Sequence, residues 1–467
     1  MIENALYMIG DETQTEEFVP ARKSIFITYL LCLMLAVVYS RTLNSLVGYL
    51  NIFIILITLC ITTKKETFLF LLGLQFFNNV IPFSLGSSAM GFLLPAYIIV
   101  FIRHYTVDAG KISTEILMIV SIFFLEVINI NNNPDKPYAS IANWVLSLWF
   151  FVEFSKQKMY FDIHEIIVYF SVAVWAICII NILEEYFVLG RTLEPNMYGN
   201  WLTSAESSKL ASFDGRDIML RFGTAYKSVE GTNGLTFDLA LGICMCLFGM
   251  TARIKKYRIF YMTSILFFFY FGFLTISRGF YVEMLILVIA FFYSGTKSAN
   301  RMLINLFITL LVVFVFGIFF MDNVEILFDA VMGRFDEGND SRDSLLQLSI
   351  KLFFADDGII LFGAGSHYPY IYHFTAHNMI FDSLLSLGAV GCTLFYGLIL
   401  KSYRRIRSYS RSKFNLFNYT PLIMLISYRM ISGCVKDHFF YYLILVCVIF
   451  TQYNHEGEGE DVCLTSR

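Results

Sequence analysis

The feature that most constrains this chain is a series of about fourteen apolar runs, separated by polar breaks, along its 467 residues. The hydrocarbon core of a bilayer is about 30 Å thick, so a helix that crosses it needs roughly 20 mostly apolar residues. Hydrophobic residues make up 57% of the chain and charged residues only 15%, whereas a soluble domain has about 25% charged residues. The runs are too uniformly apolar for barrel strands, which alternate. We therefore predict an all-α polytopic membrane protein with about 14 transmembrane helices.

The apolar runs divide the chain into three membrane parts and two long polar segments. We expect transmembrane helices 1–7 in residues 1–182, helices 8–11 in 235–320, and helices 12–14 in 377–467, which end in an acidic tail. The polar segments between them are 183–234 and 321–376. The runs are Ser24–Tyr39, Leu46–Ile61, Phe68–Phe83, Ala89–Ile102, Ile116–Ile130, Ile141–Val152, Ile166–Ile182, Leu235–Met250, Ile259–Ile276, Tyr281–Tyr293, Leu303–Phe320, Ile380–Leu400, Pro421–Ser432 and Phe439–Gln452.

The positions of lysine and arginine predict the orientation of these helices. Short cytoplasmic loops are enriched in both residues. With the N-terminus inside, the short outer loops contain only Arg41, Lys136, Arg278 and Lys436, and both termini are cytoplasmic. We expect no cleavable signal peptide, since the first 20 residues are acidic and lack an apolar core. The inner segments hold Arg22 and Lys23, Lys64 and Lys65, Arg103 and Lys111, Lys156 and Lys158, residues 253–258, Lys297 and Arg301, and residues 401–413.

The outward-facing segments contain arginines that the orientation rule does not explain. Arginine presents a planar fork that binds phosphate through two hydrogen bonds, whereas lysine offers a point charge. Ion pairing with nearby carboxylates is the alternative for any single arginine. As a set they favour a site for an anion. The set is Arg216, Arg221, Arg278 in its tight turn, Arg334 and Arg342, with Arg429 in the thirteenth run as a further candidate.

Four carboxylates fall inside apolar runs, near the outer ends of their helices. They are Glu126, Asp238, Glu283 and Asp382. A charge in lipid costs several kcal/mol unless it is paired or faces a polar cavity. A cavity open to the outer face would accommodate all four. Pairing is the alternative, for example of Glu283 with Arg278 one helical turn away.

A histidine at the start of the twelfth run is the candidate for proton transfer. His377 and Asn378 follow the second polar segment, in which Gly363-Ala364-Gly365 offers a backbone that can approach a ligand closely. Histidine titrates near neutral pH and can accept a proton from a hydroxyl. A structural role is the alternative reading of a lone interfacial histidine.

Other classes of site have little support. The nine cysteines lie mostly inside the runs without the spacing of metal ligands, and the net charge of −3 gives no reason to expect nucleic acid. We expect no metal and no cofactor.

The order of several motifs resembles the O-antigen polymerase and O-antigen ligase superfamily, and the Wzy-type polymerases of surface polysaccharide most closely. The resemblance covers roughly Arg216–Leu400. It rests on an arginine-bearing outer segment after the seventh run, Ser277-Arg278-Gly279, Gly333-Arg334-Phe335, Ser341-Arg342, Phe362-Gly363-Ala364-Gly365, His377-Asn378, Gly388 and Gly391. The chain departs from the paired Arg-x10-Gly motifs of some polymerases, because Gly231 follows Arg221 one residue too early.

This resemblance implies a glycosyltransferase-C-like fold in the cytoplasmic (inner) membrane of a bacterium, with an outward-facing active site. The implied reaction joins oligosaccharide repeat units carried on undecaprenyl diphosphate, without nucleotide sugar or metal. Membrane lipid, a chain-length regulator and a flippase are the implied partners. The arginines at 216, 221, 278, 334 and 342 would hold diphosphate, and His377 would lie at the reacting centre. Asp238 and Asp382 are alternative proton acceptors; Asn378, Glu283 and Arg429 would support the site.

Three alternatives remain open. An O-antigen ligase, which transfers finished polymer to a lipid core or protein, shares these motifs. A flippase for the same lipid-linked units would place charges at the membrane midplane and have broken helices and short loops. A non-catalytic scaffold would leave the outer arginines unexplained.

Overall fold

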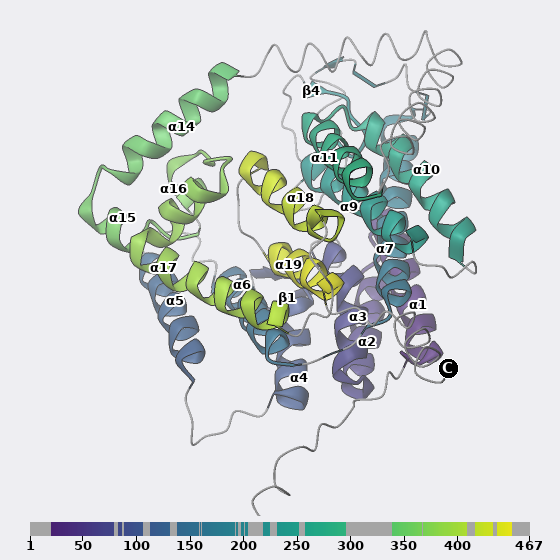
Figure 1. Cartoon of the computed structure of the whole chain (residues 1–467), viewed down its shortest axis with the longest axis horizontal. Coiled ribbons are helices and arrows are strands. Elements are labelled where there is room, and N and C mark those ends of the chain that lie inside the picture. The colour runs from purple at the N-terminus through teal and green to yellow at the C-terminus, as the bar shows by residue number, and fades with distance from the viewer. Residues whose placement is uncertain are drawn as a thin grey trace, which may run out of the picture.

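The computed structural model describes residues 20–78, 83–85, 88–105, 113–130, 138–157, 159, 161–191, 193–194, 198–199, 201–203, 218–224, 231–251, 257–295, 339–366, 368–408, 416–432 and 437–450. These residues form a bundle of helices (Figure 1). Two small antiparallel sheets accompany it: β1 (Phe83–Leu85) pairs with β2 (Ser88–Met90), and β3 (Trp201–Leu202) pairs with β4 (Ile218–Met219).

Each predicted apolar run within the described residues forms a helix over most of its length, and the run Leu303–Phe320 lies outside them. The seventh helix continues as a π-helical turn, Glu185–Leu189, so the first long polar segment begins later than expected. The helices are α1 (Lys23–Thr42), α2 (Ser45–Ile61), α3 (Lys64–Leu74), α4 (Leu93–His104), α5 (Thr114–Ile130), α6 (Tyr138–Ser155), α7 (Ile163–Glu184), α9 (Gly231–Thr251), α10 (Arg258–Leu274), α11 (Arg278–Gly295), α14 (Asn339–Phe353), α15 (Asp357–Phe362), α16 (Tyr368–Tyr372), α17 (Met379–Ser408), α18 (Leu416–Ser432) and α19 (Asp437–Phe450).

The helices are those of a membrane protein. Four of the described helices are long and apolar enough to cross a membrane: Lys23–Thr42, Ile163–Phe187, Thr232–Met250 and Met379–Ser408. Large apolar side chains such as Leu266 and Ile128 stay exposed, 70% and 63%, on the surface of the bundle. A soluble protein would not leave so many in water, whereas lipid accepts them. The predicted helical membrane class is therefore confirmed, and the count of fourteen spans stays a prediction.

The third apolar run forms less helix than the sequence predicted. Its helix, α3, ends at Leu74 and passes through a 3-10 turn to Phe77, instead of continuing to Phe83. Asn78, directly after the 3-10 turn, accepts with its side-chain oxygen a hydrogen bond from the backbone N–H of Leu93 at 3.0 Å, at the start of α4. The last residue of the predicted run, Phe83, is the first residue of strand β1.

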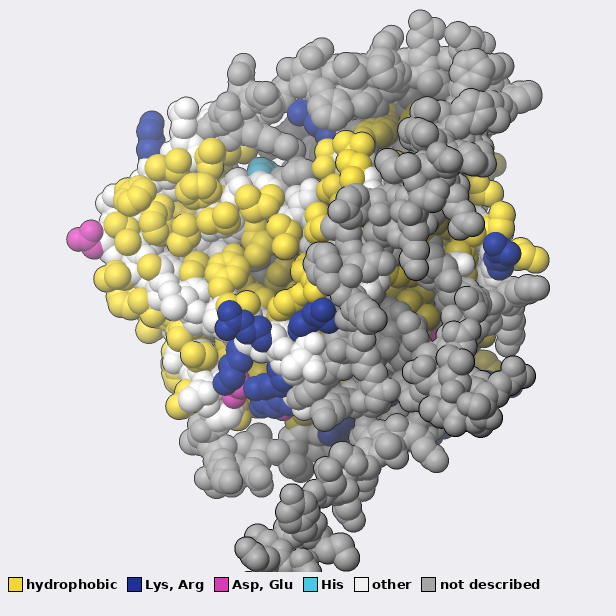
Figure 2. Space-filling model, viewed as in Figure 1, with side chains coloured by type: hydrophobic (Ala, Val, Ile, Leu, Met, Phe, Trp, Pro, Cys, Tyr) yellow, Lys and Arg dark blue, Asp and Glu magenta, His cyan; other side chains and the backbone are white. Residues whose placement is uncertain are grey.

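Basic residues gather at one end of the bundle, which we call the basic end: Arg22, Lys65, Arg103, Lys156, Lys401 and Arg405. Arg22 pairs with Glu66 at 2.7 Å and Lys65 with Glu165 at 3.0 Å. Lys401 and Arg405 both pair with Glu115, at 2.6 and 2.9 Å. These contacts join the start of α3 with the starts of α1 and α7, and the start of α5 with the end of α17. Figure 2 shows lysine and arginine side chains clustered on the lower part of one face.

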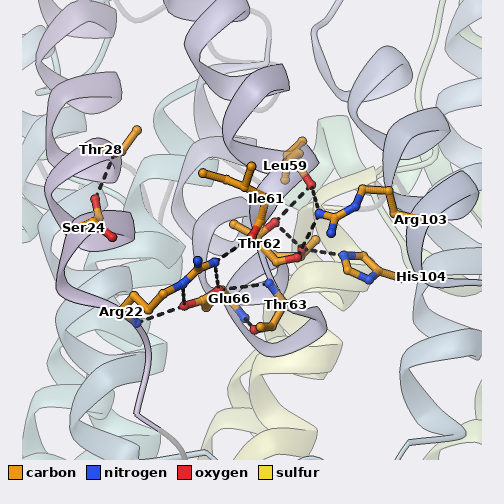
Figure 3. A network of polar contacts seen from close by, with 11 residues as sticks. Arg22, Ser24, Thr28, Leu59, Ile61, Thr62, Thr63, Glu66, Arg103 and His104 are labelled. Atoms are coloured by element: carbon orange, nitrogen blue, oxygen red, sulfur yellow. Dashed lines mark hydrogen bonds and ion pairs between the residues drawn. The ribbon is translucent and has the colours of Figure 1, made fainter.

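Arginines at the basic end also bind the last carbonyl groups of α2 (Figure 3). Arg22 donates to the carbonyl of Ile61 at 2.7 Å, and Arg103 donates to those of Leu59 and Thr62 at 2.8 and 3.1 Å. Cations near a helix C-terminus satisfy its unpaired carbonyls and interact favourably with the helix dipole.

The opposite end of the bundle is called the distal end. Because α1, α5 and α7 all start at the basic end, their C-terminal ends lie at the distal end. There, Arg41 lies over the ring of Phe187, 4.4 Å from its centroid.

The Arg22–Glu66 pair is expected to make the stability of the fold depend on pH. Burial raises the pKa of the Glu66 carboxyl, but hydrogen bonds from Arg22 and the backbone of Thr63 outweigh burial and lower the pKa from 4.5 to about 2. A lowered carboxyl pKa stabilises the fold above pH 4.5 and loses that effect as the pH falls toward 2. We expect Glu66→Gln to lower the melting temperature at pH 7 and to approach wild type near pH 3. Glutamine keeps the capping box with Thr63, so an equal deficit at both pH values would contradict the charge explanation.

Candidate functional site

The distal end contains three groups of the residues that the sequence singled out. The first group surrounds Arg221 and Arg278, the second surrounds His377 and Asp382, and the third surrounds Asp238, Glu283 and Arg429. Arg216 and Arg334 lie outside the described residues, and of Arg342 only the backbone is described, in α14. The contacts of each group follow.

In the first group, part of the long segment after α7 is fixed to the turn between α10 and α11. The backbone N–H of Phe222 donates to the carbonyl of Leu274 at 3.0 Å, at the last residue of α10. The turn that follows contains Ile276 at a positive φ of 46°, and α11 starts at Arg278. Arg221 and Arg278 therefore approach one corner of the bundle from different parts of the chain. Both side chains are half-buried.

A glutamate that the sequence analysis did not single out secures this corner. Glu185 is 1% exposed at the end of α7. Its carboxylate accepts hydrogen bonds from the hydroxyl of Tyr198 and, at 3.0 Å, from the backbone N–H of Gly223. Gly223 has a φ of 86°, and a Cβ there would lie 2.6 Å from the side chain of Leu235. In the sequence, the two adjacent glutamates at 184 and 185, at the end of an apolar run, are the signal from which this structural role could have been predicted.

In the second group, the glycine motif contacts helix backbone. Within α17, Gly388 departs from helical geometry, with φ 63° and ψ −176°. The break frees backbone carbonyls, and two of them are bound again: Ala364 N–H donates to Leu385 at 2.6 Å, and Gly365 N–H donates to Ser386 at 3.0 Å. The sequence predicts that this motif approaches a ligand. The structure shows a close approach to α17, since a Cβ on Gly363 would be 2.3 Å from the carbonyl oxygen of Ser386.

Buried carboxylates flank the glycine loop on both sides. Glu126 on α5 accepts hydrogen bonds from the backbone N–H and the hydroxyl of Ser366, at 3.0 and 2.8 Å. Asp382 on α17 accepts one from the hydroxyl of Tyr368 at 2.7 Å. Tyr368 is fully buried, so it is a structural hydrogen-bond donor and not an exposed ring for stacking on sugar.

His377 and Asn378 lie at the start of α17, with different environments. The side chain of Asn378 accepts hydrogen bonds from the backbone N–H of Ile380 and Phe381, at 3.0 and 3.4 Å, and so caps the helix. His377 is exposed, and its Nε2 lies 3.4 Å from the hydroxyl of Thr375. Its φ of 47° belongs to the left-handed region, which residues other than glycine rarely adopt. The predicted proton acceptor is therefore accessible and held in an unusual backbone conformation.

The third group is a set of charges enclosed by α9, α11, α18 and α19. Arg429 is fully buried, and its guanidinium lies over the rings of Tyr428, Phe439 and Tyr442 at 5.0, 5.8 and 5.9 Å. Tyr442 also donates a hydrogen bond to Asp238. Glu283 on α11 is 0% exposed, and α11 packs against both α9 and α18. A buried arginine costs free energy unless its charge is compensated, and Asp238 and Glu283 are the acids on the helices that enclose it.

Among the residues that the structure describes, no group of three or more His, Cys, Asp or Glu side chains is arranged to hold a metal ion. What the distal end offers is hydrogen-bond donors, cations and carboxylates. Such a set can bind an anion and transfer a proton.

Comparisons of the chain with protein-family models, with curated proteins and with solved structures gave no match.

Proposed function

We propose that this protein polymerises undecaprenyl-diphosphate-linked oligosaccharide repeat units into surface polysaccharide, such as O-antigen, capsule or exopolysaccharide. The observation that supports the proposal is the corner where Phe222, next to Arg221, hydrogen-bonds the last residue of α10, four residues before Arg278. This corner lies at the end of the bundle opposite the basic end. A lipid diphosphate would present its charge at such a membrane-level surface, and arginine forks match phosphate oxygens.

The proposal includes an orientation and a location. Loops rich in lysine and arginine stay in the cytoplasm, so the basic end faces inward and the distal end faces outward. With fourteen spans, both termini are cytoplasmic. The distal end then lies at the outer face of the bacterial inner membrane, where lipid-linked repeat units are accessible. The fold is of the glycosyltransferase-C-like type.

The chemistry follows from the charges of the distal end. A hydroxyl of the incoming repeat unit attacks the anomeric carbon of the growing chain, and the bond from that carbon to the carrier diphosphate breaks. The diphosphate leaves with the electron pair, and Arg221 and Arg278 stabilise its increasing negative charge. The proton of the attacking hydroxyl goes to His377. Each glycosidic bond formed releases one undecaprenyl diphosphate.

Two other functions share part of this argument. An O-antigen ligase would use the same donor with a lipid-core or protein acceptor, and the motifs fit both. A flippase would share the broken helix, which α17 shows at Gly388. It is more remote because the charged residues lie within a few turns of helix ends: Glu126 is four residues from the end of α5, and Asp382 is three residues from the start of α17.

Deletion of the gene followed by gel analysis of the surface glycan tests the proposal. A polymerase deletion leaves single repeat units attached to their acceptor and abolishes the ladder of longer chains. A full ladder that stays on the lipid carrier, unattached, would instead identify a ligase. Repeat units retained on the cytoplasmic side would identify a flippase.

A further inference from the structure

The segment that carries His377, residues 362–366 and 368–377, is held to two helices that are distant in sequence, and we call it the arch. At its start, the carbonyl of Phe362 accepts a hydrogen bond from Asn129 of α5 at 3.1 Å. Glu126, one turn earlier on α5, binds the backbone N–H and hydroxyl of Ser366. These contacts link residues more than 230 positions apart. The first half of the arch therefore takes its position from α5.

The second half of the arch takes its position from Asp382 through one hydroxyl group. The Tyr368 hydroxyl donates to Asp382 at 2.7 Å and accepts from the backbone N–H of Ala376 at 2.9 Å. Ala376 immediately precedes His377. The carboxylate of Asp382, the hydroxyl of Tyr368 and the backbone beside His377 thus form one continuous hydrogen-bonded chain.

The conformation of His377 needs such support. A left-handed conformation costs a non-glycine residue free energy and persists where surrounding contacts enforce it. Tyr368 is fully buried and Asp382 is 5% exposed, so water does not compete for their hydrogen bond. The bond therefore holds the backbone beside the exposed imidazole in a fixed position relative to α17.

We propose that Asp382, acting through Tyr368, is a positioning residue for His377, and that Glu126 fixes the other half of the same arch. This inference rests on the proposed function for its consequence in catalysis, and its structural part stands separately. It assigns Asp382 a different role from proton acceptor, because its accessible neighbour His377 is the group that meets the substrate.

The test uses Tyr368→Phe, which keeps the ring and removes the hydroxyl. The matched control is Tyr396→Phe, since Tyr396 hydrogen-bonds Ser383 at 2.8 Å on the same helix but does not contact the arch through its hydroxyl. In the purified full-length protein, the rate at which diethylpyrocarbonate modifies His377 is followed by peptide mass spectrometry. We expect Tyr368→Phe to change that rate severalfold and Tyr396→Phe to leave it unchanged. Equal rates in wild type and Tyr368→Phe would overturn the proposal.

Kinetics then separate positioning from direct proton transfer. We expect Tyr368→Phe and Asp382→Asn each to lower kcat about 10-fold to 100-fold with little change in KM, because a misplacement of about 1 Å is enough for such a loss. In a His377→Ala background, Tyr368→Phe should have no further effect, since it acts through His377. Full additivity in that background would overturn the proposal.

A wild-type protein without polymerase activity would instead refute the proposed function, while the modification rates would still decide whether the arch is held by Tyr368.

Discussion

Gly388→Ala is expected to abolish the accumulation of folded, active protein. The residue has φ 63° and ψ −176°, a combination that is essentially restricted to glycine and costs other residues about 1–3 kcal/mol. A Cβ would also lie 2.4 Å from the backbone nitrogen of Gly363 and 2.5 Å from the carbonyl of Leu361. Backbone atoms of a packed loop cannot rotate away as a side chain can, so the loop must separate from α17.

A second glycine of α17 provides the matched control. Gly397 is nine residues further along the same helix, and a Cβ there meets nothing within 4 Å. Alanine is favoured over glycine inside a helix by about 0.5–1 kcal/mol, so Gly397→Ala should be as stable as wild type or slightly more stable. The measurement is the amount of monodisperse protein after heating in detergent. Equal survival of Gly388→Ala and Gly397→Ala would contradict the tight contact between the glycine loop and the broken helix.

Arg278→Ala is expected to reduce polymerisation by about 10²–10³-fold, the usual loss when one preplaced donor to a developing negative charge is removed. Arg278→Lys should recover part of the activity, because lysine keeps the charge and loses the bidentate fork. Arg221→Ala should show a comparable loss if both arginines serve one diphosphate. Product chains in a complemented deletion strain are read as a gel ladder, together with Arg342→Ala and His377→Ala.

Arg258→Ala is the control for the arginine substitutions. Arg258 is exposed at the first residue of α10, at the opposite end of the helix that leads to the turn before Arg278. It should behave as wild type, provided the protein reaches the membrane at normal levels. A full ladder in Arg278→Ala would remove this arginine from the site. A loss in Arg258→Ala equal to that in Arg278→Ala would indicate a general effect on folding or insertion.

Hydropathy alone was enough to predict where most helices lie, because burial in lipid demands long apolar runs. Two local exceptions stand out. The helix α3 ends at Leu74, before its apolar run ends, and Gly388 breaks α17 within an otherwise continuous apolar run. Neither event changes the average hydropathy of its segment, so a search for apolar runs does not reveal it.

The site was predicted in parts, and the links between the parts were not. The carboxylates near helix ends and the glycine motif were visible as unusual residues for their surroundings. Their partners lie far away in sequence: Ser366 is 240 residues from Glu126, and Asn129 is 233 residues from Phe362. Such contacts depend on which helices are neighbours, which one sequence does not specify. The glycine motif shows the consequence, since its close approach is to the backbone of α17.

The most direct test of the polymerase proposal is a reaction with purified components. The protein is reconstituted into liposomes that contain undecaprenyl-diphosphate-linked repeat units isolated from the source cells, and product length is measured by gel and mass spectrometry. The proposal predicts lipid-linked chains of two, three and more repeats, with one undecaprenyl diphosphate released per bond and the activity lost in Arg278→Ala. Repeat units that remain single, or that move only when a lipid-core or protein acceptor is added, would contradict it.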